Sequence, residues 1–257
     1  MTVGKVAWVA GVALAIGTIT TGAALAAAFP GNQGDSWAAI AKLPPLTGVY
    51  EIARIPNGPK DGPRDTKPVL SPAAVAQLEA YKALQAKGLE QDTQAANCLP
   101  PGMPHVMDQP YPIQVLLTPG DVTIIQEAYM QVRHVHTDGR KHPDNPDPTF
   151  NGDSIGHWEG DTLVIDTIGL APDAMLQAGV QHSAKMHIVE RIRLSDPNML
   201  EIRTTIDDPG VLTQPWSYVG RYARHPDWSI AEYVCEQNNR NSVDANGKAS
   251  INLDLKK

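Results

Sequence analysis

Acidic, phenolic and basic side chains alternate with apolar ones along Val122–His136, which reads VTIIQEAYMQVRHVH. Successive side chains of a strand point to opposite faces, so a single strand here would place Glu127, Tyr129 and Arg133 on one face. In an open sheet that polar stripe would simply contact water. In a closed barrel it would line a cavity, where a carboxylate, a phenol and a guanidinium group can orient a ligand or move protons. Whether this polar stripe contacts water or lines a cavity therefore depends on the fold.

A second set of chemically capable residues lies further along the chain. Alternation in HSAKMHIVERIRL puts His187 and Arg191 on the same face of a strand. Asp166 interrupts the otherwise apolar run Thr162–Ile168, where a carboxylate needs either a cationic partner or a cavity. Arg191 could pair with Asp166 or with Asp207 as a structural ion pair. Alternatively, His187 beside that arginine acts as a general base.

Rings with a polar group complete this inventory. His157 and Trp158 precede a predicted turn, and Trp216 begins a later strand. Tryptophans offer flat apolar walls to a ligand. The candidate catalytic residues are therefore Glu127, Tyr129, Arg133, His187 and Arg191. The candidate substrate-binding residues are His157, Trp158, Asp166 and Trp216.

Two further motifs suggest other chemistry but fit it poorly. The spacing of His134 and His136 would suit a metal, yet Arg140 stands where a cupin barrel would supply a glutamate. The string GDSIG at Gly152–Gly156 resembles a serine-hydrolase elbow, which requires a helix where a β-hairpin is expected here. Nor does any nucleotide-binding loop occur. We predict no metal site and no cofactor.

The N-terminal segment has the composition of an export signal. Lys5 precedes an apolar run over Val6–Ile16, and small residues follow up to Ala28. Residues 1–28 are therefore predicted to be a signal peptide cleaved after Ala26 or Ala28, with an uncleaved anchor as the alternative. The protein would then be periplasmic or secreted, without a membrane segment after cleavage. Its net charge of −7 and the lack of a long basic run argue against nucleic acid as a partner.

The chain contains two cysteines, Cys98 and Cys235. Exported proteins fold in an oxidising compartment, where such a pair usually bonds. We predict a disulfide between them, and two buried free thiols are the alternative.

The rest of the pattern indicates one mainly β domain over residues 29–257. Ser71 and Pro72 begin a helix near residues 72–87, a shorter helix ends near Lys42, and the polar tail from Asn238 is expected to be disordered. The expected strands, separated by turn residues, are Leu46–Ile55, Gln114–Leu117, Val122–His136, Ser154–Trp158, Thr162–Ile168, Lys185–Leu194, Met199–Ile206, Trp216–Tyr222 and Ser229–Cys235. This series predicts an antiparallel, lipocalin-like β-barrel with one or two N-terminal helices.

Several longer motifs carry a resemblance that covers Leu43–Asn238. They are CLPPGMP, RHVHTDGRKHP, GDSIGHWEGDTLVIDT, ERIR, DDPG followed by QPW, and EYVCEQN. Together they resemble a family of exported, mostly uncharacterised proteins of sphingomonads, other proteobacteria and acidobacteria. This family is similar to the phenylcoumaran gamma-formaldehyde lyase of bacterial lignin-dimer breakdown. The resemblance assigns no catalytic residues, so the candidates above rest on the strand pattern.

The resemblance implies loss of a hydroxymethyl group as formaldehyde from an aromatic dimer, without a cofactor. His187 or Glu127 would take the alcohol proton, while Tyr129 with Arg133 or Arg191 would hold phenolic oxygens. We therefore expect a lyase or isomerase acting on a small aromatic molecule in a barrel cavity. The alternatives are a non-catalytic barrel that binds a hydrophobic small molecule, and a structural envelope protein. A homodimer is left open.

Overall fold

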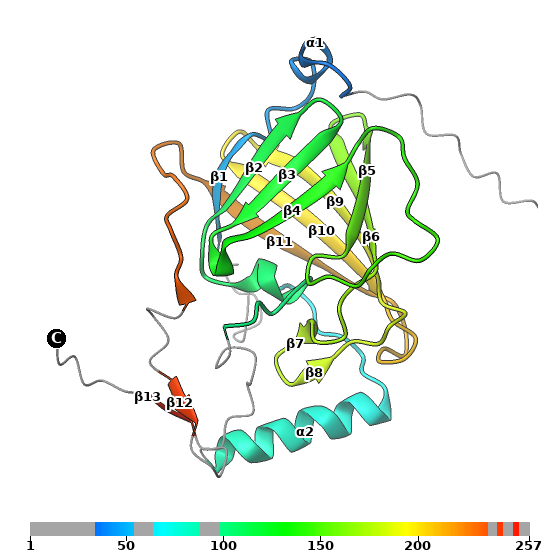
Figure 1. Ribbon diagram of the computed structural model, residues 1–257, viewed down its shortest axis with the longest axis vertical. Helices are drawn as coiled ribbons and strands as arrows, with labels where there is room; N and C mark the ends of the chain where they lie inside the picture. Colours follow the sequence, from blue (N-terminus) through cyan, green and yellow to red (C-terminus); the bar gives the residue numbers. More distant parts are fainter. Residues whose placement is uncertain (1–33, 54–63, 88–97, 236–240, 244–248, 252–257) are drawn as a thin grey trace, which may run out of the picture.

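The computed structural model describes residues 34–53, 64–87, 98–235, 241–243 and 249–251. The predicted signal peptide and its cleavage site lie outside these residues. Nine strands close into one barrel in the order β1-β11-β10-β9-β6-β5-β4-β3-β2 (Figure 1). They are β1 Gly48–Ile52, β2 Ile113–Thr118, β3 Asp121–Gln126, β4 Gln131–His136, β5 Asp153–Glu159, β6 Thr162–Ile168, β9 His187–Asp196, β10 Met199–Asp207 and β11 Trp216–Arg224. The prediction of a mainly β, lipocalin-like barrel is confirmed.

Strand pairing in this barrel is antiparallel except at one junction. β4 and β5 run parallel and are joined through only two residue pairs, Val135 with Ser154 and His136 with Ile155. By contrast, β9 and β10 pair along nearly their whole length, from Met199 opposite Asp196 to Asp207 opposite His187. The long connection over residues 137–152 is what lets β5 run in the same direction as β4.

Alternating apolar side chains of these strands fill the barrel. On β9, for example, Ile188 and Ile192 are buried while Arg191 and Arg193 are exposed, as the period of two requires. On β6 both faces are largely covered, so the alternation that would separate inside from outside is weak there.

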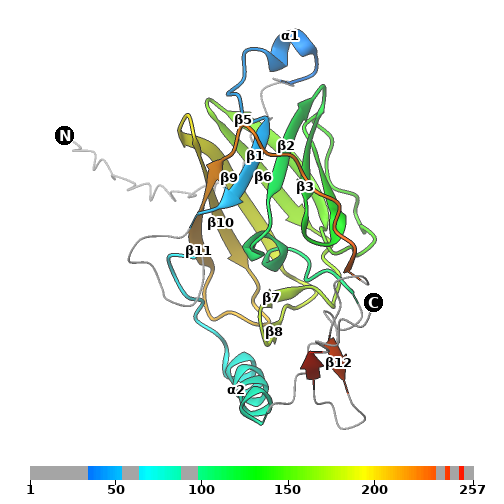
Figure 2. The same ribbon diagram turned by 90° about the vertical axis from the view of Figure 1, so that its left-hand side faces the viewer.

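Two helices and a small hairpin lie outside the barrel wall. α1 (Trp37–Ile40) begins at Ser36, whose hydroxyl accepts a hydrogen bond from the Ala39 amide. α2 (Pro72–Ala86) begins in the same way at Ser71 and contacts the strand pair β7 (Met175–Gln177) and β8 (Val180–Gln181) through β8. Figure 2 shows α2 beyond one end of the barrel, with β7 and β8 between them. Both helices were predicted.

The segment that carries the polar stripe is not one strand. β3 ends at Gln126 and β4 begins at Gln131, with a short 3₁₀ turn over Ala128–Met130 between them. Tyr129 and Met130 have positive φ angles of 59° and 49°. The prediction of one continuous strand is wrong because the chain reverses here through left-handed residues that are not glycine, which leave no turn signal in the sequence.

The C-terminal part also departs from expectation. Residues 229–235 form no strand but are fixed by the disulfide between Cys98 and Cys235, which was predicted. Two short strands, β12 (Asn241–Val243) and β13 (Ala249–Ile251), pair within the tail that we expected to be disordered. The prediction of a strand over Ser229–Cys235 is therefore wrong.

Candidate functional site

The barrel interior is centred on a buried ion pair. The guanidinium group of Arg133, on β4, donates to the carboxylate of Glu190, on β9, and each side chain is only 1% exposed. Arg133 also donates to the Ser154 hydroxyl at 3.1 Å and to the Thr167 hydroxyl at 2.8 Å. Because a buried charge requires such partners, this network satisfies Arg133 without any ligand.

A proline-rich segment packs into the barrel interior beside this network, where the Met103 sulfur lies 3.8 Å from the Arg133 guanidinium group. Its short 3₁₀ helix η1 (His105–Asp108) carries Met107 into the interior, and Met103 precedes it. The Gln126 amide donates to the Met107 sulfur at 3.4 Å, and the Tyr222 hydroxyl donates to the Met107 carbonyl oxygen at 3.0 Å. We call residues 103–108 the plug.

Among the described residues, a small cavity lies beside the plug. It measures about 10 Å³ and is lined by Met103, Met107, Glu190, Ile202, Thr204, Tyr218, Gly220 and Tyr222. Such a volume holds about one water molecule. This cavity is too small for an aromatic substrate, although a reaction in a barrel cavity was expected.

The two candidate tryptophans belong to the packed core. Trp158 lies within the hydrophobic core, and Trp216 is buried with its indole N–H donating to the Thr66 hydroxyl at 2.9 Å. The Arg64 guanidinium lies 4.7 Å from the Trp216 ring centroid. Both rings therefore have structural partners.

Glu127 and Tyr129 lie at the end of the β3–β4 hairpin rather than inside the barrel. The Glu127 carboxylate accepts a hydrogen bond from the Ala231 amide at 2.8 Å, and the Tyr129 ring lies 5.3 Å from the Tyr233 ring. These contacts hold the C-terminal segment against the hairpin. The structure does not bring either residue together with His187.

Two histidines and two aspartates gather on the outer surface of β5, β6 and β9. His187 Nε2 lies 2.8 Å from one oxygen of Asp166, and His142 Nε2 lies 2.9 Å from the other. His142 Nδ1 lies 2.5 Å from Asp153. We call these four residues the His–Asp cluster. Of the sequence candidates, it unites Asp166 and His187, whereas His142 and Asp153 are additions.

Electrostatics in this cluster favour a charged pair. The hydrogen bond that the His187 ring donates to Asp166, opposed by partial burial, raises the pKa of His187 above its ordinary value. Burial alone would raise the pKa of Asp166, but hydrogen bonds from His187 and His142 outweigh it and hold that pKa below its ordinary value. The side chain of His187 remains 41% exposed. Within the described residues its Nδ1 has no hydrogen-bond partner, so it can exchange a proton with a molecule outside.

The remaining candidates on this face pair elsewhere. Arg191 bonds the Glu159 carboxylate at 2.8 Å, and His157 lies 3.2 Å from the same side chain. The expected pairing of Arg191 with Asp166 or Asp207 is therefore wrong. Glu159, the last residue of β5, bonds to Arg191. The two oxygens of Asp166 are instead bonded to the two histidines of the His–Asp cluster.

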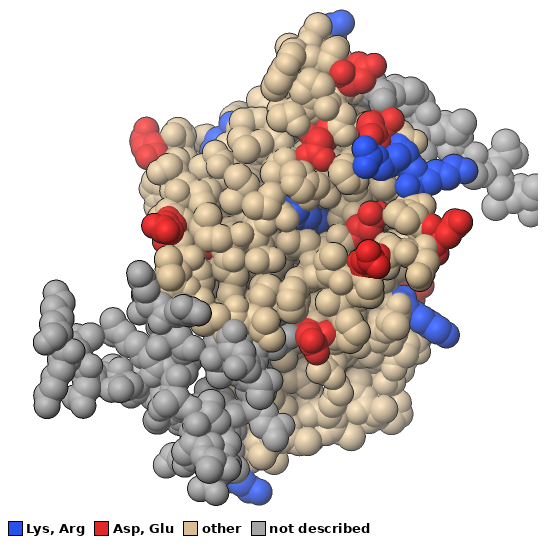
Figure 3. Space-filling model, in the orientation of Figure 1, with Lys and Arg blue, Asp and Glu red and all other residues tan. Residues whose placement is uncertain are grey.

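An open groove adjoins the His–Asp cluster where β4 and β5 diverge. Its volume is about 460 Å³, and its lining includes Asp153 of the cluster, Phe150, Asn151 and, at its buried floor, Arg133. Charged side chains of both signs gather on the loop between β4 and β5, while much of the neighbouring barrel face is uncharged (Figure 3). A small molecule of mixed polarity fits such a groove better than the interior cavity.

The histidines of the His-x-His motif share a different carboxylate. Nδ1 of His134 and Nδ1 of His136 each lie 3.3 Å from Asp121. Among the described residues, no group of three or more His, Cys, Asp or Glu side chains is arranged to hold a metal ion. Ser154 of the GDSIG string is buried inside the barrel on a strand, where it cannot act as an exposed hydrolase nucleophile.

Comparisons with known proteins leave the family open. No protein-family model matches the chain, and a search of curated proteins finds no significant relative. Within the described residues, no helix is long and apolar enough to cross a membrane.

Proposed function

We propose that the protein is a cofactor-independent lyase that acts on a small aromatic, lignin-derived type of molecule at the His–Asp cluster. The observation that carries this proposal is the pairing of His187 with Asp166. The carboxylate fixes one ring nitrogen and increases the basicity of the imidazole, while the side chain of His187 remains 41% exposed. This is the arrangement of a general base held by an acidic residue.

The reaction that fits this base, and the family resemblance, is release of formaldehyde from a cyclic aromatic ether bearing a hydroxymethyl group. In its neutral form, His187 takes the hydroxyl proton, and the oxygen electrons form the formaldehyde C=O as the carbon–carbon bond breaks. The released electron pair forms a C=C bond and expels the ring-ether oxygen as a phenoxide. Protonated His187 then returns its proton to that phenoxide, so atoms and charge balance without a redox partner.

The groove beside the cluster supplies a surface for the aromatic part. It shares Asp153 with the cluster and includes Phe150 as an apolar wall. We further propose that the protein works in the periplasm or outside the cell, since disulfides form and persist in oxidising compartments.

The groove also supports a second candidate, a binding protein without turnover. One experiment separates the two: mature protein is incubated with a phenylcoumaran-type dimer while formaldehyde release and dimer binding are both measured. The lyase proposal predicts formaldehyde in proportion to turnover. Saturable binding without formaldehyde would instead support the binding protein. The absence of both binding and formaldehyde release would overturn both candidate functions.

A matched pair of variants locates the site. His187→Gln should reduce the rate by at least about 100-fold, the usual contribution of a general base. His225→Gln is the control, because His225 lies at the end of β11 and pairs with Glu51 away from the cluster. Full activity in His187→Gln would show that the cluster is not the site.

A further inference from the structure

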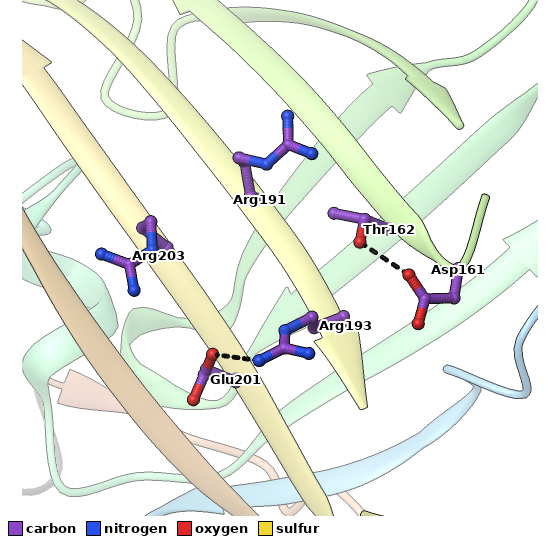
Figure 4. Close-up of a pocket in the computed structure, with 6 residues that line it drawn as sticks. All are labelled: Asp161, Thr162, Arg191, Arg193, Glu201 and Arg203. Atoms are coloured by element: carbon purple, nitrogen blue, oxygen red, sulfur yellow. Dashed lines mark hydrogen bonds and ion pairs between the residues drawn. The ribbon is translucent and has the colours of Figure 1, made fainter. Parts of the chain in front are cut away.

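A hollow lined only by polar and charged side chains lies on another part of the barrel surface. It has a volume of about 260 Å³ and is bounded by Asp161, Thr162, Arg191, Arg193, Glu201 and Arg203, from β6, β9, β10 and the turn before β6. Figure 4 shows Arg193 directed toward Glu201, while the guanidinium groups of Arg191 and Arg203 point away from each other. We call it the arginine hollow.

Strand register places two of these arginines on neighbouring strands. Arg203 on β10 lies directly opposite Arg191 on β9. Like charges in directly opposite positions of an antiparallel pair destabilise a sheet. The protein as a whole is acidic, with a net charge of −7, so this concentration of arginines is a local exception.

Among the described residues, the carboxylates near the arginine hollow pair with Arg191 and Arg193 but not with Arg203. Glu201 is shared by Arg193 at 3.0 Å and Arg221 at 3.4 Å, and Arg191 bonds Glu159 at 2.8 Å. Within the described part of the chain, no hydrogen bond or ion pair engages the guanidinium group of Arg203. Arg203 therefore retains all of its donors at the edge of the hollow.

We propose that the arginine hollow binds a small oxyanion of the phosphate type. Guanidinium groups recognise phosphate oxygens through paired hydrogen bonds, and an anion bound by the Arg203 guanidinium group would offset the excess positive charge on this face of the sheet. Its lining contains no aromatic or aliphatic side chain, which excludes an apolar ligand, and its volume suits an anion or the anionic end of a larger molecule. The site uses none of the four residues of the His–Asp cluster.

The test is calorimetric titration of the mature protein with inorganic phosphate at constant ionic strength, with sodium chloride as the comparison. Wild type should bind phosphate saturably, and Arg203→Gln should bind it at least about tenfold more weakly, the loss typical of a hydrogen bond to a charged group. Arg203→Lys, which keeps the charge but not the planar group, should fall between them. Arg140→Gln is the matched control, because Arg140 is an exposed arginine that pairs with Asp138 elsewhere.

Thermal melting is a second measurement, which distinguishes specific phosphate binding from general charge effects. Without phosphate at low ionic strength, Arg203→Gln should melt at a higher temperature than wild type because the repulsion with Arg191 is removed. Addition of phosphate should reduce or reverse that difference. Equal phosphate affinity in wild type and Arg203→Gln, or an equal response to chloride, would overturn the proposal. Titration with glycerol phosphate then distinguishes a site for the free ion from one for a phosphate ester.

Discussion

Arg133 and Glu190 form an ion pair between β4 and β9 across the interior of the barrel, with both side chains almost fully buried. The two residues are 57 positions apart in sequence. Their pairing links the strand at the β4–β5 junction to the opposite part of the barrel wall, and it accounts for a cation that the sequence pattern assigned to catalysis.

Removal of Arg133 should therefore act on stability. Arg133→Ala leaves the Glu190 carboxylate buried without its partner, which should lower the free energy of unfolding by about 3 to 5 kcal/mol. Urea denaturation of the two proteins measures this difference. The double variant Arg133→Met with Glu190→Leu should recover much of the loss because neither charge remains. A loss below about 1 kcal/mol in Arg133→Ala would indicate that water replaces the missing partner.

The titration of His187 should depend on Asp166. Asp166→Asn removes the negative charge that stabilises the imidazolium ion, so the pKa of His187 should fall toward its ordinary value. Histidine proton resonances followed over a pH series report this midpoint directly. His225→Gln serves to identify one other resonance without touching the pair. An unchanged midpoint in Asp166→Asn would contradict the hydrogen bond described here.

The same pair should make stability dependent on pH. The pKa of His187 is raised in the folded protein, so its contribution is fully present below the unfolded value of 6.5 and is lost as pH rises through the folded value. The unfolding free energy of wild type should therefore exceed that of His187→Gln most clearly near pH 6 and least near pH 9. Thermal or urea unfolding at both pH values checks the sign. A larger difference at pH 9 would contradict it.

The plug should control access to the interior. Met103→Ala removes a fully buried side chain and should lower the free energy of unfolding by about 2 to 5 kcal/mol, since a cavity remains. The enlarged cavity should also take up a small apolar probe such as benzene, which wild type excludes. Met130→Ala, at an exposed methionine on the β3–β4 turn, is the control. Equal probe binding by wild type would mean that the plug already moves aside.

The disulfide should contribute strongly to stability. It closes a loop with a sequence separation of 137 residues, which in the chain-entropy model corresponds to about 4 to 5 kcal/mol. Unfolding of the Cys98→Ser, Cys235→Ser double variant, compared with oxidised wild type, measures it. Unchanged stability would show that the reduced chain is already constrained by other contacts.

Sequence predicted the barrel well because alternation and turn residues are local signals. On β9 and β10 the period of two is regular, and turns such as Asp196–Asn198 are of a familiar type. The reversal at Tyr129 left no such mark, because alternation continues on both sides of it. A single strand and a hairpin therefore look alike in that segment.

The candidate site was only partly predictable for a different reason. Asp166 was expected either to pair with a cation or to stand in a cavity, and in the structure two histidines bond to it. Because β6 is covered on both faces, the sequence did not reveal that Asp166 points outward. His142 reaches it from the long connection between β4 and β5, and no periodicity places a loop residue. The signal that could have found it is chemical, since an outward carboxylate needs a partner and His142 stands close to β5 in the chain.

The two-pair junction between β4 and β5 is where we expect the barrel to open most readily. Every other neighbouring pair in the barrel can form as part of an antiparallel sheet, whereas this parallel pairing brings together the two edges left by the long 137–152 connection. It also depends on Gly156, because a Cβ there would lie 2.8 Å from a methyl carbon of Val135. Because only two residue pairs join β4 to β5, we expect amide hydrogen exchange to be fastest at this junction of the barrel.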